Sequence, residues 1–249
     1  MTNKNLIINK FKRVKNLGYV KSHRRNNTGI GKTFEDFIGV AENNLDQPDL
    51  AGFEIKAHRE LAQSYVTLFT KSPSFPKGAN SFLRDTFGIP YEENRNLKKL
   101  HTSMFADKLN SFAGKYAFRL INDRKKKCIF IAVYSLKTKK LIDCSCGYLY
   151  EDLEVILKKK LKSLFYVSAQ TKKDKKGNEY FFFDKADIYE QPSFVKFINL
   201  IDKGIIMFDI RIGSYQSGPN AGKAHDHGSG FRIREQDFHK LYSIHEKVE

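Results

Sequence analysis

Two carboxylates and a lysine stand close together in the run LDQPDLAGFEIKAHR, residues 45–59. Asp49, Glu54 and Lys56 form the pattern P-D-x4-E-x-K. Apolar and polar residues alternate around Glu54, which predicts a strand whose side chains at Glu54 and Lys56 leave the same face. A glycine-containing turn can fold Asp49 back beside them. Asp49 and Glu54 offer oxygen ligands that suit Mg²⁺, with Mn²⁺ as an alternative ion. Such an ion would polarise a phosphodiester and help to ionise an attacking water. Lys56 would orient that water or stabilise charge on the phosphate.

The bare pattern has low specificity, because a chain of this composition contains about 0.5 chance matches. Its alternative explanation is a surface strand with a salt bridge between neighbouring side chains. The helix that precedes the strand adds Glu35 as a further candidate catalytic acid. Glu35 can point at the same metal site, or it can face solvent like an ordinary helix residue.

A second set of polar residues lies near the C-terminus. Asp209 and Arg211 alternate with apolar residues, so both share one face of an expected strand. A glycine-rich loop and another strand then supply Tyr215, Lys223, His225, His227 and Arg232. Arg can grip guanine by two hydrogen bonds, Asp can accept from cytosine, and His can do either. The inventory therefore indicates contacts with G·C base pairs. A metal site at the two histidines is an alternative, although a third ligand is not evident.

Local patterns predict the elements that must position these residues. Thr33 is the expected N-cap of an amphipathic helix over 34–44. A basic, glycine-containing loop over 21–32 precedes it, and a Pro- and Gly-rich loop over 71–80 follows the catalytic strand. Other strands are expected at 64–70, 116–121, 128–135, 141–149, 164–170, 179–184, 205–212 and around 231–233, and other helices over 1–20 (ending near Gly18), 151–163 and 192–203. Residues 91–112 fit neither period.

Composition narrows the class of partner. The chain has 249 residues, long enough for one domain or two closely joined lobes, and carries a net charge of +16. This charge favours nucleic acid or an anionic membrane, the alternative being a merely basic protein. No apolar run approaches the ~20 residues of a membrane-spanning helix, and the N-terminal apolar stretch is too short for a signal peptide. We therefore expect a cytoplasmic protein without a membrane partner. The odd number of cysteines (Cys128, Cys144 and Cys146) favours reduced thiols over zinc.

Two blocks of the chain resemble the MvaI/BcnI family of type II restriction endonucleases, relatives of the mismatch-repair nicking enzyme MutH. The first contains TGIGKTFED, NLDQPD, FEIKAH, TLFTKSP and PKGAN, and the second contains DIRIGSYQSG and GKAHDHGSGFRI. They span about residues 27–81 and 209–233, while residues 82–204 match only loosely. The likeness is closer to the MvaI type.

The resemblance implies an α/β fold: a PD-(D/E)XK nuclease core, with a mixed β-sheet flanked by helices, and a second, DNA-reading lobe as in MutH. Residues 1–90 would form part of the catalytic lobe, and 91–249 the remaining core elements and the major-groove lobe. Asp49, Glu54 and Lys56 fall on the family's catalytic positions and Glu35 on its helix acid. Lys71, Ser72 and Lys77 fall in a loop that would approach the minor groove.

The implied activity is Mg²⁺-dependent cleavage of double-stranded DNA by a monomer at a CC-N-GG-type site, with CC(A/T)GG as the expected target. A cognate DNA methyltransferase is expected in the same system. Two alternatives stay open: a MutH-like nickase that needs repair partners, and a basic nucleic-acid-binding protein without catalysis. The complete acid-acid-lysine set argues against the second.

Overall fold

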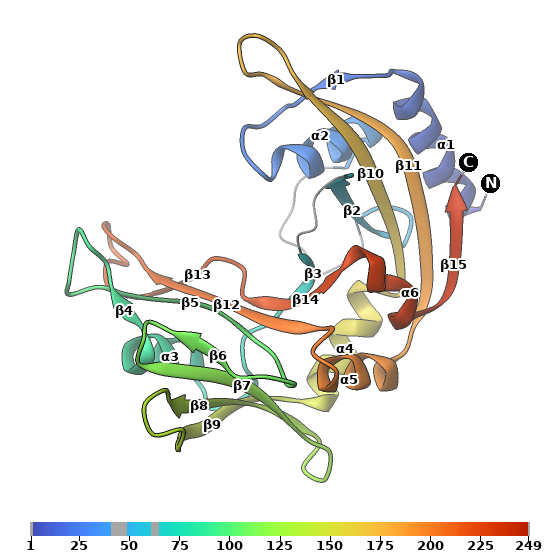
Figure 1. The fold of residues 1–249 in the computed structure, drawn as a ribbon. Coiled ribbons are helices and arrows are strands. Elements are labelled where there is room, and N and C mark those ends of the chain that lie inside the picture. Colours follow the sequence, from blue (N-terminus) through green and yellow to red (C-terminus); the bar gives the residue numbers. More distant parts are fainter. Residues whose placement is uncertain (1, 41–48, 61–64, 249) are drawn as a thin grey trace. The chain divides into compact units, whose positions relative to one another are not determined.

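The computed structural model describes residues 2–40, 49–60 and 65–248. The chain forms two units, each assembled from segments that are distant in the sequence (Figure 1). Unit 1 comprises Met1–Ser64, Ile156–Ser193 and Phe238–Glu249, and unit 2 comprises Tyr65–Val155 and Phe194–Asp237. The residues of the P-D-x4-E-x-K pattern belong to unit 1, and the C-terminal polar block belongs to unit 2.

Unit 1 contains a five-stranded mixed sheet. Its strands are β1 (Val20–Lys21), β11 (Glu179–Pro192), β10 (Ser163–Lys173) and β2 (Glu54–Arg59), in that order, and β15 (Tyr242–Val248) also pairs with β11. β10 is antiparallel to β11 and parallel to β2. Within the described residues β2 pairs only with β10, so the strand of the pattern lies at the edge of the sheet.

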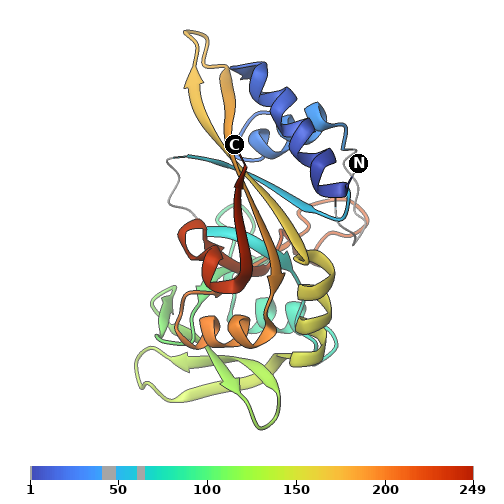
Figure 2. The same ribbon diagram turned by 90° about the vertical axis from the view of Figure 1, so that its right-hand side faces the viewer.

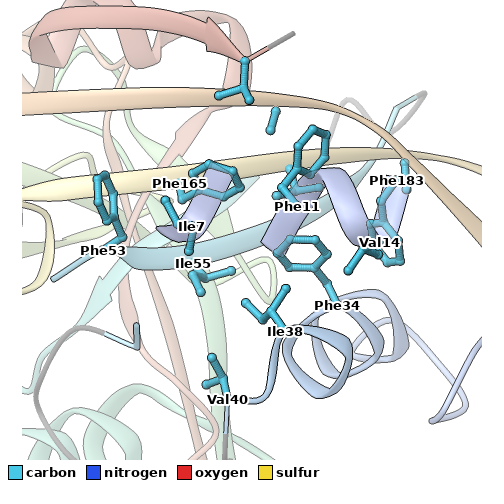
Figure 3. Close-up of a cluster of buried hydrophobic side chains, with 14 of the residues drawn as sticks. Ile7, Phe11, Val14, Phe34, Ile38, Val40, Phe53, Ile55, Phe165 and Phe183 are labelled. Atoms are coloured by element: carbon cyan, nitrogen blue, oxygen red, sulfur yellow. The ribbon is translucent and has the colours of Figure 1, made fainter. Parts of the chain in front are cut away.

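Two helices, α1 (Asn3–Asn16) and α2 (Gly29–Ile38), cover one face of this sheet. Figure 3 shows Phe11 of α1 and Phe34 of α2 among the sheet residues of the core. The buried positions of α1 and α2 recur every three or four residues, which places them on one face of each helix. Ile55 of β2 joins the same core. The alternation of side chains then directs Glu54 and Lys56 to the opposite face of the sheet.

The start of α2 differs from the prediction. Thr33 is not the N-cap: the helix begins at Gly29, and Thr33 lies inside it, fully buried. The Thr33 hydroxyl donates to the Gly29 carbonyl at 2.7 Å and accepts from the backbone N–H of His23 at 2.9 Å. The side chain therefore satisfies backbone groups of the neighbouring loop. The helix ends before Gly39, whose φ is +77°, and the expected residues 41–44 lie outside the described part of the chain.

Unit 2 contains two sheets. The first has the order β3 (Tyr65–Thr70), β14 (Gly230–Arg234), β12 (Met207–Ser214), β5 (Lys98–Met104) and β4 (Ile89–Pro90), with β13 (Ala224–Asp226) paired to β12. The second is the antiparallel meander β6 (Asn110–Phe112), β7 (Tyr116–Asp123), β8 (Cys128–Ser135) and β9 (Leu141–Leu149). Phe208, Ile210 and Ile212 of β12 are fully buried, which leaves Asp209 and Arg211 on the other face.

The remaining helices are α3 (Ala79–Phe87), α4 (Tyr150–Lys160), α5 (Phe194–Asp202), η1 (Glu235–Asp237) and α6 (Phe238–Leu241). One of the crossings of the chain between the units lies within α4. Figure 2 shows the same elements from a second side. The helices expected over 151–163 and 192–203 and the three strands of the meander are confirmed. Residues 91–112, which fitted neither period, contain the strands β5 and β6. The end of the expected loop 71–80 is already helical, because α3 begins at Ala79.

Candidate active site and nucleic-acid interface

Glu54 and Lys56 form an ion pair on one face of β2. The Lys56 Nζ lies 3.0 Å from the Glu54 Oε1. Glu54 is buried, and its second oxygen, Oε2, has no hydrogen-bond partner among the residues that the structure describes. A buried carboxylate oxygen without a donor is costly unless a further ligand satisfies it. The pair therefore leaves one oxygen available for a cation.

A tight turn brings Asp49 back to the same strand. Leu50 and Phe53 exchange two backbone hydrogen bonds, of 3.1 and 2.8 Å. Ala51 and Gly52 between them have φ of +53° and +82°, the left-handed geometry of a two-residue hairpin turn. The Asp49 Oδ2 then accepts from the backbone N–H of Ile55 at 2.7 Å. Asp49 is thus fixed beside the residue that separates Glu54 from Lys56.

The donors at this site fit a small divalent cation. The orphaned oxygen of buried Glu54 and the exposed carboxylate of Asp49 are hard ligands, which Mg²⁺ prefers. No group of three or more His, Cys, Asp or Glu residues placed to hold a metal ion occurs in the described part of the chain. A Mg²⁺ site completed by waters and substrate phosphates needs only one or two protein carboxylates, so two suffice.

Glu35 lies on α2, directly after the core residue Phe34, and is half-buried. The helix α2 packs on the Ile55 side of the sheet, which is opposite to the face of β2 that carries Glu54. Sequence reasoning placed Glu35 on a helix beside the catalytic strand, and the helix and its contact with β2 are observed.

Two groups around the edge strand were not predicted. His58 follows Glu54 and Lys56 on the same face of β2, and its ring centroid lies 6.2 Å from that of Tyr166. Burial, and to a smaller extent the charge of Glu54, raises the pKa of Tyr242, so this phenol stays protonated near the carboxylate. The period of two could have identified His58. No local signal could have identified Tyr242, because only the pairing of β15 with β11 brings it there.

In unit 2, one carboxylate holds two arginines. Asp209 is buried, and its Oδ2 lies 2.6 Å from the Arg211 Nε and 3.2 Å from the Arg232 Nε. Its Oδ1 accepts from the Ser103 hydroxyl at 3.1 Å. The Arg211 side chain is 49% exposed and that of Arg232 only 16%. Burial lowers the pKa of Arg232, while Asp209 opposes that shift. The arginine heads are therefore oriented before any ligand arrives.

Four ring side chains near Arg211 contact one another in a row. Tyr215 stacks on His225 with ring centroids 4.2 Å apart, and His225 lies 4.2 Å from His227. His101 of β5 is 5.9 Å from His227 and pairs in register with Arg211. A Cβ at position 213 would lie 2.7 Å from the His227 Nε2, so the glycine there admits this ring. His101 was missed by sequence reasoning, since its strand showed no clear period.

The other predicted contact residues lie in loops of the same unit. The backbone N–H of Lys71 donates to the Ser229 carbonyl at 3.2 Å, and the Ser72 hydroxyl accepts from Asn80 at 3.1 Å. Asn80 also donates to Asp226, between the two histidines, at 3.1 Å. Lys77 is exposed, and the Lys223 Nζ donates to Asn220. These hydrogen bonds thus connect the loop 71–80 to the segment 225–229, which contains His225 and His227.

The three cysteines are free, and burial raises the pKa of Cys146 to about 11, so it stays a protonated thiol at neutral pH. None of the helices in the described part of the chain has both the length and the apolar composition needed to span a bilayer.

An edge strand that carries Glu-x-Lys behind a folded-back aspartate, in a mixed sheet covered by helices, defines a nuclease of the PD-(D/E)XK type. The chain belongs to the MvaI/BcnI restriction endonuclease family, whose model matches residues 8–242. It is a type II site-specific endonuclease that acts on DNA. Enzymes of this family generally use divalent metal ions.

Two solved structures are similar over almost the whole chain. One is the complex of restriction endonuclease MvaI with its cognate DNA substrate, at 33% identity, 98% coverage of both chains and a TM-score of 0.90. The other is MvaI in the absence of DNA, at 32% identity, 100% coverage of this chain and 98% of that one, and a TM-score of 0.66. No curated protein sequence matches the chain.

Proposed function

We propose that this endonuclease hydrolyses phosphodiester bonds of double-stranded DNA at CC(A/T)GG, with Mg²⁺ as the metal and Mn²⁺ as a substitute. The observation that carries the proposal is the placement of Asp49 beside Ile55, between an ion-paired Lys56 and a buried Glu54 with an unsatisfied oxygen. A structural salt bridge alone does not require an unsatisfied oxygen beside a second carboxylate that a turn folds back to the same strand.

Each side chain of the site then has a defined part. Bound Mg²⁺, with Asp49 and Glu54 as its protein ligands, supplies Lewis-acid polarisation of the phosphate and a lowered pKa of water. The ion pair with Glu54 fixes the Lys56 ammonium near the metal ligands, where it orients the attacking water or stabilises charge on the phosphate. Glu35 lies on the helix that contacts the edge strand, and it tunes the charge of the site from that side.

Unit 2 supplies the base contacts. Arg211 donates to Asp209, and Arg232 lies within ion-pair distance of Asp209 and donates to the Gly228 carbonyl. Both guanidinium groups are thus oriented, which suits two-bond recognition of guanine. Asp209 itself is buried, so its contribution is to fix the two arginine heads. His225 and His227 complete the pattern; the stack of His225 on Tyr215 and the contact of His227 with His225 restrict the rotamers that the two rings can adopt.

The polar and cationic residues in the loops of unit 2 contact the sugar-phosphate backbone of the DNA. Loops near His225 and His227 carry Lys71, Ser72, Lys77 and Lys223. Cationic and hydroxyl groups of this kind position a duplex without reading its sequence. The MvaI-type blocks of the sequence and the 33% identity to MvaI support CC(A/T)GG as the target. We further propose that the enzyme acts as a monomer and that a cognate methyltransferase protects the host DNA.

Plasmid digestion tests the whole proposal. Purified protein is incubated with plasmid DNA in Mg²⁺, in Mn²⁺ and in chelator, and the product ends are sequenced. The proposal expects linear products whose ends all map to CC(A/T)GG, with no cleavage in chelator. Ends at a different sequence would overturn the target. Accumulation of nicked circles without linear product would favour a strand-nicking enzyme instead.

A further inference from the structure

A basic cavity of about 870 Å³ lies in unit 1, away from the acidic site. The loop that follows β1 and the hairpin that joins β10 to β11 form its walls, and the end of β2 forms its floor. Its lining contains six cationic side chains: Lys21, Arg24, Arg25, Arg59, Lys173 and Lys176. The single lining carboxylate is Glu179.

That carboxylate is already neutralised. Arg59 donates from Nε to the Glu179 Oε1 at 2.9 Å and from Nη2 to Oε2 at 2.8 Å, a two-bond ion pair. The hydrogen bonds from Arg59 hold the pKa of Glu179 below its usual range. Lys21, Arg25 and Lys176 have no side-chain hydrogen bond or ion pair with any described residue, so their charges are available to a ligand. The cavity is strongly positive.

The walls of the cavity are held in place without a ligand. Arg59 also donates to the carbonyls of Asn26 and Asn27, at 3.4 and 3.3 Å. The backbone N–H of Ser22 donates to the Glu179 carbonyl at 2.8 Å, which joins the two walls. At the hairpin tip the Asp174 carboxylate accepts from the backbone N–H of Lys176. Free cations on an ordered backbone suit a phosphate oxygen, which each can contact as a charge-assisted hydrogen-bond donor.

The cavity is linked to the proposed active site by β2 itself. Arg59 is the last residue of the strand and Glu54 the first, so the two are separated by about 17 Å at a rise of ~3.3 Å per residue. On one DNA strand, this length corresponds to about five base-pair steps of ~3.4 Å. Arg59 is five residues from Glu54, so its side chain leaves the opposite face of β2, and the cavity is reached at the end of the strand. A duplex cut at Glu54 and running past that end would place backbone outside the recognised base pairs at the cavity.

We propose that this cavity binds backbone phosphates of the DNA that flanks the cleavage site. The inference rests on the proposed function for the position of the duplex, while the cavity itself is defined by the structure. Such contacts carry no sequence information, so they raise the affinity for every duplex equally and hold the flank during cleavage.

The test is the salt dependence of binding by the triple variant Lys21→Gln, Arg25→Gln and Lys176→Gln. On a duplex of about 30 base pairs, the expected losses are about tenfold in affinity at low salt and about 2–3 in the slope of log K against log salt. On a duplex that ends about three base pairs from the cut on the cavity side, the variant and the wild type should bind alike, because the DNA then stops short of the cavity. The ratio of cognate to random affinity should be unchanged.

The matched control is Lys137→Gln, Lys139→Gln and Lys140→Gln, which removes three exposed charges from the turn between β8 and β9. If the two triple variants have the same affinity and the same salt slope, overall charge explains the effect and the cavity proposal is wrong. A changed slope in a protein that cleaves no DNA would support the cavity and reject the proposed function. Specific cleavage by a protein whose salt slope is unchanged by the triple variant would support the proposed function and reject the cavity proposal. Thermal melting of both variants confirms that each is folded.

Discussion

The Lys56 Nζ lies 3.0 Å from the Glu54 Oε1, while the other oxygen of this buried glutamate has no partner among the described residues. The lysine therefore pairs with Oε1 of the glutamate and leaves Oε2 available to a cation. The hydrogen bond from the Ile55 backbone to Asp49 fixes the second carboxylate next to it. These contacts give each of the three residues a separable role.

Replacing the lysine should stop cleavage without removing the metal ligands. We expect Lys56→Ala to lower the cleavage rate by about 10²–10³-fold, because it removes a positioned charge at the reacting phosphate. Rates are measured on plasmid DNA at saturating enzyme, and a thermal melt controls for loss of the Glu54 ion pair. Cleavage at the wild-type rate would reject the catalytic assignment.

Asp49→Asn should separate binding from chemistry. The amide oxygen can still accept from the Ile55 N–H, so the turn should persist, but a charged metal ligand is lost. We expect cleavage to fall by at least about 10²-fold, the scale on which single groups that stabilise the transition state act. The affinity for cognate duplex should be equal or higher, since negative charge near the phosphates is removed. Glu246→Gln, which neutralises an exposed glutamate paired with Lys4, is the matched control and should change neither quantity. Joint loss of binding and cleavage would indicate a structural role for Asp49.

Glu35→Gln tests the helix acid. The change keeps the shape of the side chain and removes its charge, so a tuning role predicts slower cleavage and a shift to higher Mg²⁺ concentration for half-maximal rate. The neighbouring change Asp36→Asn, on a residue that pairs with His23 and Lys32, should leave the Mg²⁺ dependence unaltered at saturating enzyme. Identical Mg²⁺ profiles for Glu35→Gln and the wild type would remove Glu35 from the site.

Arg211→Ala distinguishes base reading from support of the strand. If Arg211 grips a guanine, its loss should weaken cognate binding by ~1–3 kcal/mol and leave random-sequence binding nearly unchanged. If the residue serves only to pair with Asp209, stability should fall while the ratio of the two affinities stays constant. Thermal melts and affinities on both duplexes, measured on the same variant, decide between the two.

Acidification should destabilise the protein through His101. Partial desolvation of the exposed His101 ring, followed by the positive charges of His227, Arg211 and Lys99, lowers the pKa of His101 below its usual 6.5, and Asp209 opposes this only in part. The unfolded chain therefore binds a proton at His101 more readily than the folded protein. This contribution to stability is present above pH 6.5 and is lost as the pH falls through that value. We expect His101→Gln to lose less Tm than the wild type between pH 7.5 and 5.5, as followed by calorimetry. An equal loss in both proteins would contradict the prediction.

The sequence by itself determined how residues that are close together on one strand are placed relative to each other. The period of two around Glu54 and Lys56 predicted a strand with both side chains on one face, and β2 has that geometry. The same rule placed Asp209 and Arg211 together, and they form an ion pair on β12. Local periodicity is sufficient in these cases because the residues are two apart on one element.

Only the tertiary structure decided which distant groups join them. Arg232 reaches Asp209 because β14 pairs with β12, and His101 lies opposite Arg211 because β5 pairs with the other edge of that strand. Thr33 has the residue type of an N-cap, but the helix begins four residues earlier, at Gly29. The Thr33 hydroxyl instead accepts from the His23 N–H of the preceding loop and donates to the Gly29 carbonyl. Tyr242 comes near Glu54 through the pairing of the last strand. Strand order and register follow from the burial of whole faces, which local sequence patterns alone do not specify.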